Sequence, residues 1–279
     1  MGAAVSPAAA PLAAIVFSRD RAMQLDALLR SFFLHRQDDA PLEISVLYAA
    51  TTPAFAAQYR DLSRERWPGQ AYARLHFVRQ ANFYRDVFRL LMGTCYTSLA
   101  PLYYRVTLQR RLGLQRWAGC WPLRSQAEIV LFLVDDSLFV RPFSLAQAAG
   151  CLRDHPDLLG FSLRLGRNTG YCYTRDRPQE LPQFSELQPG IVHFDWTRAQ
   201  GDFAYPLEVS SSVYRLADVL QSLQTKPFDN PNELEDAISA GAERFRAQRP
   251  RLACLELSAA FPGPVAAYRL HGIDRHREG

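Results

Sequence analysis

The N-terminal part of the chain alternates short apolar runs with helical hydrophobic patterns, which limits the folds open to it. Apolar runs typical of buried strands occur at Leu12–Phe17, Ile44–Tyr48 and Leu75–Val78. Leucine and phenylalanine at helical spacing follow the first run, and Thr52 and Asn82 are placed to cap helices after the other two. This alternation predicts a parallel α/β sheet with right-handed crossovers.

The rest of the chain is less regular. Its expected elements are a strand over Glu128–Val134, a helix from Ser144 to Leu152, a strand over Leu158–Leu165, a helix over Leu216–Leu223 and a helix opening at Asn230. Residues 93–127 interrupt the rhythm with aromatic residues and arginines, and we interpret them as a helical insertion. Residues 166–206 contain Gly, Pro and aromatic residues without periodicity, which predicts loops.

Composition excludes several classes of protein. Hydrophobic residues make up 48% and charged residues 22% of the 279 residues, which is typical of a globular chain. No apolar run approaches the roughly 20 residues of a membrane span, and no signal peptide is evident, so we expect a soluble, cytoplasmic protein. The five cysteines form no CxxC motif, and the basic residues are scattered, so neither a zinc ribbon nor a nucleic-acid-binding tail is expected.

Two adjacent carboxylates follow the most apolar strand. Asp135 and Asp136 come directly after the six apolar residues Ile129–Val134, at the strand end where open α/β sheets bind ligands. Neighbouring anions repel unless a cation or hydrogen bonds compensate them. A divalent metal such as Mg²⁺ or Mn²⁺ would meet that demand, while a turn capped by one of the two aspartates is the alternative.

Three segments carry a family resemblance. The order of LAAIVFSRDRAMQLDALLRSF, ISVLYAATTPAF and EIVLFLVDDSLFVRPFSL resembles nucleotide-sugar-dependent glycosyltransferases of the GT-A fold, over about residues 12 to 272. The resemblance implies a Rossmann-type, mostly parallel sheet flanked by helices, in a single domain over 1–279. Its nucleotide-sugar-binding half would be 12–142, and its loop-rich acceptor half 143–279. One departure is Ser137, which stands where the family's DxD metal motif has its second acid.

The resemblance also implies roles for particular residues. Sugar transfer from a nucleoside diphosphate needs positively charged groups beside the leaving diphosphate. It also needs a carboxylate or histidine base for the acceptor hydroxyl. The residues implied in donor binding are Ser18, Arg19, Arg21, Asp135, Arg164 and Arg167. Mn²⁺ or Mg²⁺ would be held by Asp136, with His271 as a further ligand near the C-terminus; a tail histidine without a function is the alternative.

The last expected helix supplies the first candidate for the base. At 100° per residue, Glu235 lies at the edge of the apolar face that contains Leu234, whereas Asp236 points to solvent. Glu233 fits a capping box. Glu235 also matches the acceptor-side carboxylate of the family, although a solvated helix charge is the alternative, and Asp202 is the second candidate.

Two further segments contain clustered polar residues. His193 and Asp195, beside Trp196, are expected in a loop of the sort that stacks on sugar faces, and Ser210–Ser212 is expected to cap a helix. Two other functions stay open: a sugar-phosphate nucleotidyltransferase, disfavoured because no Gly-rich phosphate loop follows the first strand, and a catalytically inactive domain that binds a glycan or a protein. No GxSxG, Walker, GxGxxG or HExxH motif occurs. The leading expectation is transfer of a sugar from a nucleoside diphosphate to a glycan or other hydroxyl acceptor, in polysaccharide synthesis.

Overall fold

The computed structural model describes residues 12–92, 127–172, 175–223 and 228–262. Its strands are β1 (Leu12–Arg19), β2 (Leu42–Ala49), β3 (Ala73–Arg79), β4 (Ile129–Val134), β5 (Ser137–Phe139), β6 (Leu158–Ser162), β7 (Tyr171–Cys172), β8 (Arg177–Pro178), β9 (Ser185–Gln188), β10 (Ile191–Asp195), β11 (Ser212–Arg215), β12 (Arg251–Leu255) and β13 (Ala260–Pro262). Its helices are α1 (Ala22–His35), α2 (Pro53–Leu62), α3 (Phe83–Met92), α6 (Leu145–Asp154), α7 (Leu216–Ser222) and α8 (Pro231–Ala240), with 3₁₀ turns η1 (Gln70–Tyr72), η4 (Gly201–Ala204) and η5 (Ala242–Phe245).

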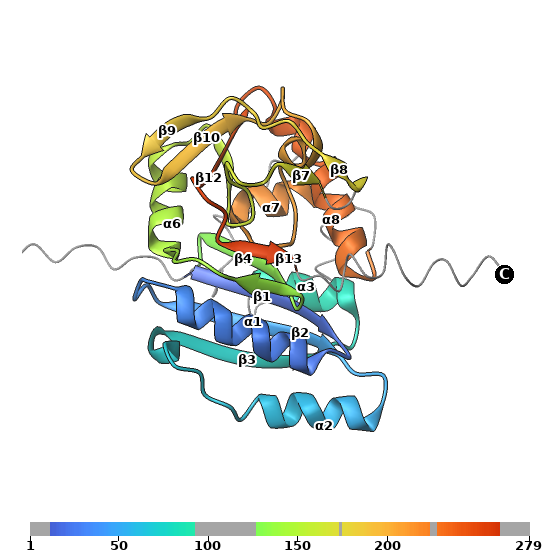
Figure 1. Cartoon of the computed structure of the whole chain (residues 1–279). Helices are drawn as coiled ribbons and strands as arrows, with labels where there is room; N and C mark the ends of the chain where they lie inside the picture. Colours follow the sequence, from blue (N-terminus) through green and yellow to red (C-terminus); the bar gives the residue numbers. More distant parts are fainter. Residues whose placement is uncertain (1–11, 93–126, 173–174, 224–227, 263–279) are drawn as a thin grey trace, which may run out of the picture.

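The described part of the chain contains one nine-stranded sheet, in the order β3-β2-β1-β4-β11-β6-β12-β10-β9 (Figure 1). The pairs β3–β2, β2–β1, β1–β4 and β6–β12 are parallel. Strand β11 lies between β4 and β6 and is antiparallel to both, and β10 is antiparallel to β12 and β9. The predicted α/β class and the parallel pairing of the first strands are confirmed, and the second half adds antiparallel strands.

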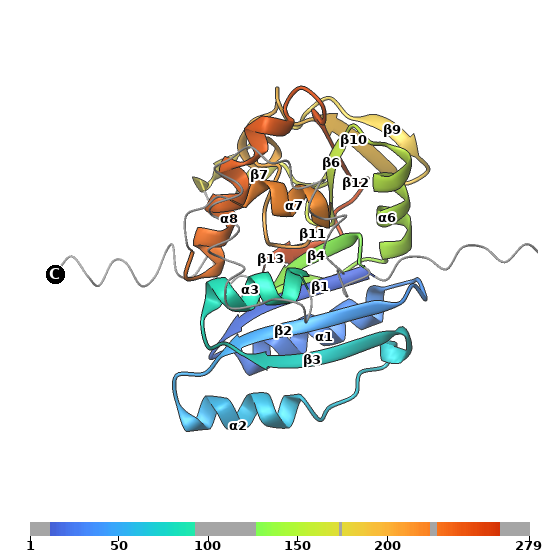
Figure 2. The same ribbon diagram turned by 180° about the vertical axis from the view of Figure 1, so that it is seen from behind.

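Alternate residues of the central strands supply two hydrophobic cores, one on each face of the sheet. Leu12, Ala14 and Val16 of β1 pack on one face with residues of α1, α2 and α6. Ile15 and Phe17 pack on the other with residues of α3, α7 and α8. In Figure 1 α1 lies in front of the parallel strands, and in Figure 2, seen from behind, α3 lies in front of them.

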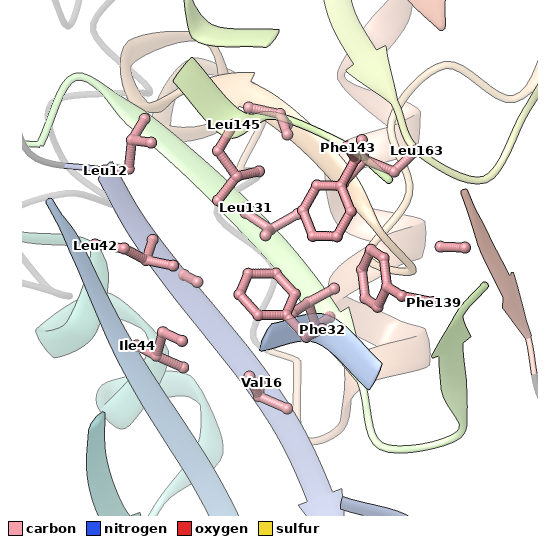
Figure 3. Packing of buried hydrophobic residues seen from close by; sticks show 14 of the residues in the cluster. Leu12, Val16, Phe32, Leu42, Ile44, Leu131, Phe139, Phe143, Leu145 and Leu163 are labelled. Atoms are coloured by element: carbon pink, nitrogen blue, oxygen red, sulfur yellow. The ribbon is translucent and has the colours of Figure 1, made fainter. Parts of the chain in front are cut away.

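In the first core, the residues that follow β4 pack against α1. Figure 3 shows Phe32 of α1 close to Phe139 and Phe143. The rings of Phe32 and Phe139 meet edge to face with centroids 5.2 Å apart, and those of Phe139 and Phe143 stack at 4.6 Å. This packing fixes the segment after Asp136 against α1.

The predicted caps are confirmed. Thr52 accepts a hydrogen bond from the Phe55 amide at 3.2 Å, and Pro53 opens α2. The side chains of Asn82 and Ser144 likewise accept from the third residue after each of them. Asn230 accepts from the Glu233 amide at 3.0 Å, so α8 begins where its sequence predicted.

Two expectations were wrong. Residues 166–206 are not all loop, because β9 and β10 form a hairpin closed by Pro189-Gly190, with Gly190 at φ +78°. Ser210–Ser212 caps no helix: Ser212 begins β11, and α7 starts after Arg215 without a side-chain cap. The expected insertion at 93–127 lies mostly outside the described residues. No helix in the described ranges is long and apolar enough to cross a membrane.

Candidate functional site

The candidate residues gather at the edge of the sheet where the parallel strands end. Strands β1, β4 and β6 have their carboxyl ends there. Strand β11 starts there, because Ser212 pairs with Phe132 of β4 and with Ser162 of β6 in antiparallel register. Residues 208–212 and the residue pair Asp135–Asp136 therefore lie on the same edge, which is the usual ligand-binding edge of an open α/β sheet.

Arg21 compensates the two aspartates. Its Nη1 lies 3.3 Å from Asp135 Oδ1 and 3.4 Å from Asp136 Oδ2. The backbone amide of Arg19 also points to Asp135 Oδ2, at 3.4 Å. Asp135 is only 6% exposed, and burial raises the pKa of its carboxyl, although a hydrogen bond from Ser18 and the charge of Arg21 oppose this rise. The paired anions thus have a cation of the chain itself between them.

A buried tyrosine holds the end of β1 in place. Tyr59 of α2 is fully buried, and its hydroxyl shares a 2.6 Å hydrogen bond with Ser18 Oγ. The same hydroxyl accepts from the Arg21 amide at 3.0 Å. The Tyr59 ring stacks on Tyr48 of β2 with centroids 4.4 Å apart. Ser18 and Arg21 are therefore positioned by α2, which the sequence did not indicate.

A second set of charged groups lies at the start of β11. Glu208 is buried, and its Oε2 lies 3.6 Å from Arg164 Nε. Arg164 Nη1 lies 3.7 Å from Asp202 Oδ2. These contacts give the buried Arg164 guanidinium two carboxylate neighbours, whose charges raise its pKa against the opposing effect of burial.

Glu235 joins this second set from α8. Its Oε2 accepts a hydrogen bond from the Val209 amide at 2.8 Å. Burial raises the pKa of Glu235 from 4.5 to about 7, and the neighbouring Glu208 charge adds to the rise, while the Val209 amide, Arg164 and Tyr205 oppose it. Asp236, the next residue, is exposed. The helical periodicity predicted this difference correctly.

Asp202 is held by several neighbours. It lies in η4, where Gln179 Nε2 donates to its Oδ2 at 3.2 Å and the Cys172 thiol donates to Oδ1 at 3.3 Å. Gly201 has φ +60°, and a Cβ there would lie 2.3 Å from Gln179 Oε1. Glycine adopts this left-handed backbone without strain and leaves room for Gln179 beside Asp202.

The remaining predicted residues lie elsewhere. Arg167 is exposed, pairs with Glu256 at 3.4 Å and lies over the Phe184 ring. His193 and Asp195 lie in strand β10 rather than in the expected loop, and Asp195 is opposite Arg251 of β12 at the other edge of the sheet. Trp196 is only 4% exposed, and Arg246 lies over its ring, so the expected stacking of this ring on a sugar is wrong. His271 lies outside the described residues.

Metal ligands are sparse in the part of the chain that the structure describes. No group of three or more His, Cys, Asp or Glu residues there could hold a metal ion. Asp136 offers hard carboxylate oxygens, the type that Mg²⁺ and Mn²⁺ prefer. Among the described residues Arg21 is the group that lies against both carboxylates.

Comparison with known proteins identifies a sequence relative. No family model matches the chain. The chain is 25% identical over 219 residues to the bifunctional glycosyltransferase pgtA of Dictyostelium discoideum, a match that covers 74% of this chain. The chain is similar to a glycosyltransferase. It spans about a quarter of the length of pgtA, since the match covers 24% of that protein. The similarity to pgtA confirms the resemblance to glycosyltransferases that the sequence segments indicated.

Solved structures similar to the chain include TarS of S. aureus. TarS itself is 16% identical with a TM-score of 0.47, over 93% of this chain and 38% of TarS. TarS 1–349 in complex with UDP is 17% identical with a TM-score of 0.45, over 93% of this chain and 62% of that one.

Sequence reasoning missed Glu208, Tyr205 and Tyr59. Glu208 is an acid between the apolar residues Leu207 and Val209, and that isolation was its only local signal. Tyr59 lies in the helix that Thr52 was predicted to cap, but nothing in the sequence showed that its hydroxyl meets Ser18. The contacts of Glu208, Tyr205 and Tyr59 depend on which elements the fold brings together.

Proposed function

We propose that the chain is a glycosyltransferase that moves a sugar from a nucleoside diphosphate to a hydroxyl group of a glycan or another acceptor, with the reaction at the carboxyl edge of the sheet. The observation that carries the proposal is the register of β11, which brings Glu235 and its partners to the edge that holds Asp135 and Asp136. Similarity to pgtA supports the same chemistry.

The donor side of the proposed site is the end of β1 and β4. A leaving diphosphate gains negative charge, which must be neutralised. Arg19 is exposed at this edge, and Arg21 lies beside it with its guanidinium between the two aspartates. Ser18 is buried, so its proposed contribution is to fix this strand end through Tyr59 and Asp135.

A divalent cation is part of the proposal. Asp136 would hold Mn²⁺ or Mg²⁺, and His271 is the proposed further ligand. When bound, such an ion neutralises the charge that builds up on the diphosphate. Arg21 has to move away from Asp136, at least in part, for the carboxylate to turn to the ion.

Glu235 is the proposed base. In a direct displacement the acceptor oxygen bonds to the anomeric carbon, the bond from that carbon to the diphosphate breaks, and the acceptor proton passes to the base. A carboxylate with a pKa of about 7 retains a high affinity for that proton and is still ionised in part at neutral pH. Asp202 is less suitable, because its oxygens already accept from Gln179 and Cys172.

Calorimetric binding of UDP, GDP, CDP and dTDP, each with and without Mn²⁺, tests the donor side. We expect one diphosphate to bind in a metal-dependent way and D136N to lose that dependence. The matched control is D61N, since Asp61 is an exposed aspartate of α2. Wild-type, metal-dependent affinity in D136N contradicts the metal role, and binding of none of the four contradicts the transferase.

Turnover tests the acceptor side. E235Q should bind the diphosphate as the wild type does and lose transfer by on the order of a hundredfold or more. D236N is the control, because it removes the adjacent, exposed carboxylate of the same helix. Unchanged turnover in E235Q excludes Glu235 as the base.

A further inference from the structure

The carboxylate of Glu208 accepts hydrogen bonds from the residues on both sides of Ser211, from a backbone amide before it and from a side-chain hydroxyl after it. Its Oε2 accepts a hydrogen bond from the Ser210 amide at 2.8 Å, and its Oε1 accepts from the Ser212 hydroxyl. The Glu208 amide in turn donates to the Tyr214 hydroxyl at 2.9 Å. Glu208 and Tyr214 are 5% and 1% exposed. A single buried side chain therefore closes the turn that leads into β11.

The turn contains a strained residue. Ser211 has φ +80°, a left-handed conformation that residues other than glycine, asparagine and aspartate rarely adopt. Its amide donates to the Phe132 carbonyl at 2.9 Å, and its carbonyl accepts from the Leu163 amide at 3.0 Å. Such strain persists only where surrounding contacts hold it. The two Glu208 bonds hold the residues immediately before and after Ser211.

The same turn orients Glu235. The Val209 amide, between Glu208 and Ser210, is the donor that reaches Glu235 Oε2. Val209 is 2% exposed, so water does not replace this bond. Loss of the Glu208 contacts frees the turn and moves the amide that fixes the Glu235 carboxylate.

The surroundings of Glu235 are charged on several sides. Glu208 and Arg164 face it from the start of β11 and the end of β6, and Tyr205 hydrogen bonds to it from the end of η4. Tyr214 of β11 is also close enough to interact, and Asp236 is its exposed neighbour on α8. Of these groups, Glu208 is the one whose carboxylate also contacts the turn; burial raises its pKa, and the charge of Arg164 and hydrogen bonds from Ser212 and Ser210 oppose the rise.

We propose that Glu208 is a positioning residue, which holds the strained turn 208–212 in the conformation where the Val209 amide fixes the Glu235 carboxylate at the sheet edge. The proposal rests on the proposed function, because it gives Glu208 its purpose through Glu235. Glu208 itself is buried behind Glu235 and Arg164 and takes no proton from the acceptor.

Two substitutions separate its hydrogen bonds from its charge. In E208Q the amide oxygen still accepts from Ser210, and the amide nitrogen donates to the Ser212 hydroxyl, while the charge is gone. In E208A both bonds are lost. S212A removes only one of them, and serves where E208A does not fold. D236N, the exposed carboxylate beside Glu235, is the control for all three.

Enzymatic readouts follow from this design. E208A and S212A should lose kcat, E208A by on the order of tenfold or more, with little change in KM for the donor. E208Q should keep most of kcat at its plateau, and the acidic limb of its pH profile should move to lower pH, because a negative neighbour of Glu235 has been removed. D236N should change neither kcat nor the pH profile. A wild-type plateau in both E208A and S212A overturns the proposal.

Two measurements need no activity and so distinguish failure of this inference from failure of the proposed function. Carboxyl ¹³C NMR of the full chain, with the Glu235 signal assigned by its absence in E235Q, should show that E208Q lowers the Glu235 pKa toward 4.5. Hydrogen exchange at the Val209 amide should be faster in S212A than in the wild type and unchanged in D236N. An unchanged Val209 exchange rate in S212A overturns the positioning role even if the enzyme proves to be a glycosyltransferase.

Discussion

Replacing Glu235 by glutamine should stabilise the protein at neutral and alkaline pH, although the same change should abolish the proposed reaction. The raised pKa of Glu235 means that the folded chain prefers the protonated carboxyl, whereas the unfolded chain ionises at the ordinary value of 4.5. A group of this kind adds stability below pH 4.5, and the contribution is lost as pH rises through about 7. Glutamine is neutral throughout and has no such loss.

The structure sets the size of the effect. A rise in pKa from 4.5 to about 7 corresponds to about 3.5 kcal/mol at 1.4 kcal/mol per pKa unit. The free energy of unfolding of E235Q minus that of the wild type should therefore be constant below pH 4.5. It should then rise by roughly 1.4 kcal/mol per pH unit and level off above pH 7, about 3.5 kcal/mol higher. Glutamine keeps an oxygen for the Val209 amide, so any difference in packing adds a constant.

Urea unfolding of the two proteins over about pH 4 to pH 8.5 measures this difference, with equal m-values as the check that the unfolded states match. Titrating groups that do not interact with Glu235 are common to both proteins and cancel. D236N against the wild type should show no comparable rise, because Asp236 is exposed. A stability difference that stays flat across the range refutes the burial argument and, with it, the raised pKa on which the proposed base depends.

Two further predictions concern the sheet edge and the core. R21A should lower the free energy of unfolding by about 2 kcal/mol, because it leaves Asp135 buried beside a second anion; in a double-mutant cycle with D135N the losses should be less than additive, and strict additivity contradicts the role of Arg21 as the compensating cation. G160A should cost about 1 to 3 kcal/mol, since a Cβ would lie 2.5 Å from the Tyr214 ring. The matched G150A, in α6 with nothing within 4 Å of the new methyl group, should stabilise by about 0.5 to 1 kcal/mol. Equal effects of the two glycine substitutions in thermal unfolding rule out the packing explanation.

Features with a local cause were predictable from the sequence. A cap such as Asn230 acts within three residues, and the burial of Glu235 rather than Asp236 follows from the turn of one helix. The parallel strands were predicted from runs of apolar residues, which are recognisable in the sequence without knowledge of the neighbouring strand. The β9–β10 hairpin also had a local signal in Pro189-Gly190, which the prediction of loops over 166–206 did not use.

Features that depend on contacts between distant segments were not predictable. Strand β11 has only four residues, and its place between β4 and β6 comes from the tertiary fold. Trp196 shows the same limit, since the residue type alone does not distinguish a buried indole from one exposed to sugar. The repulsion between Asp135 and Asp136 was foreseen, but the compensating Arg21 lies 114 residues from Asp135 in the sequence.

The charges at the sheet edge indicate how a donor would have to bind. Arg21 is engaged with Asp135 and Asp136, and Arg164 lies between Asp202 and Glu208. Among the described residues at the ends of β1 and β4, the exposed Arg19 supplies one further positive charge. A leaving diphosphate needs more positive charge than one guanidinium supplies. In the proposed function Asp136 would hold a divalent cation that supplies this charge, and Arg21 beside it would be the next cationic group available to the phosphates.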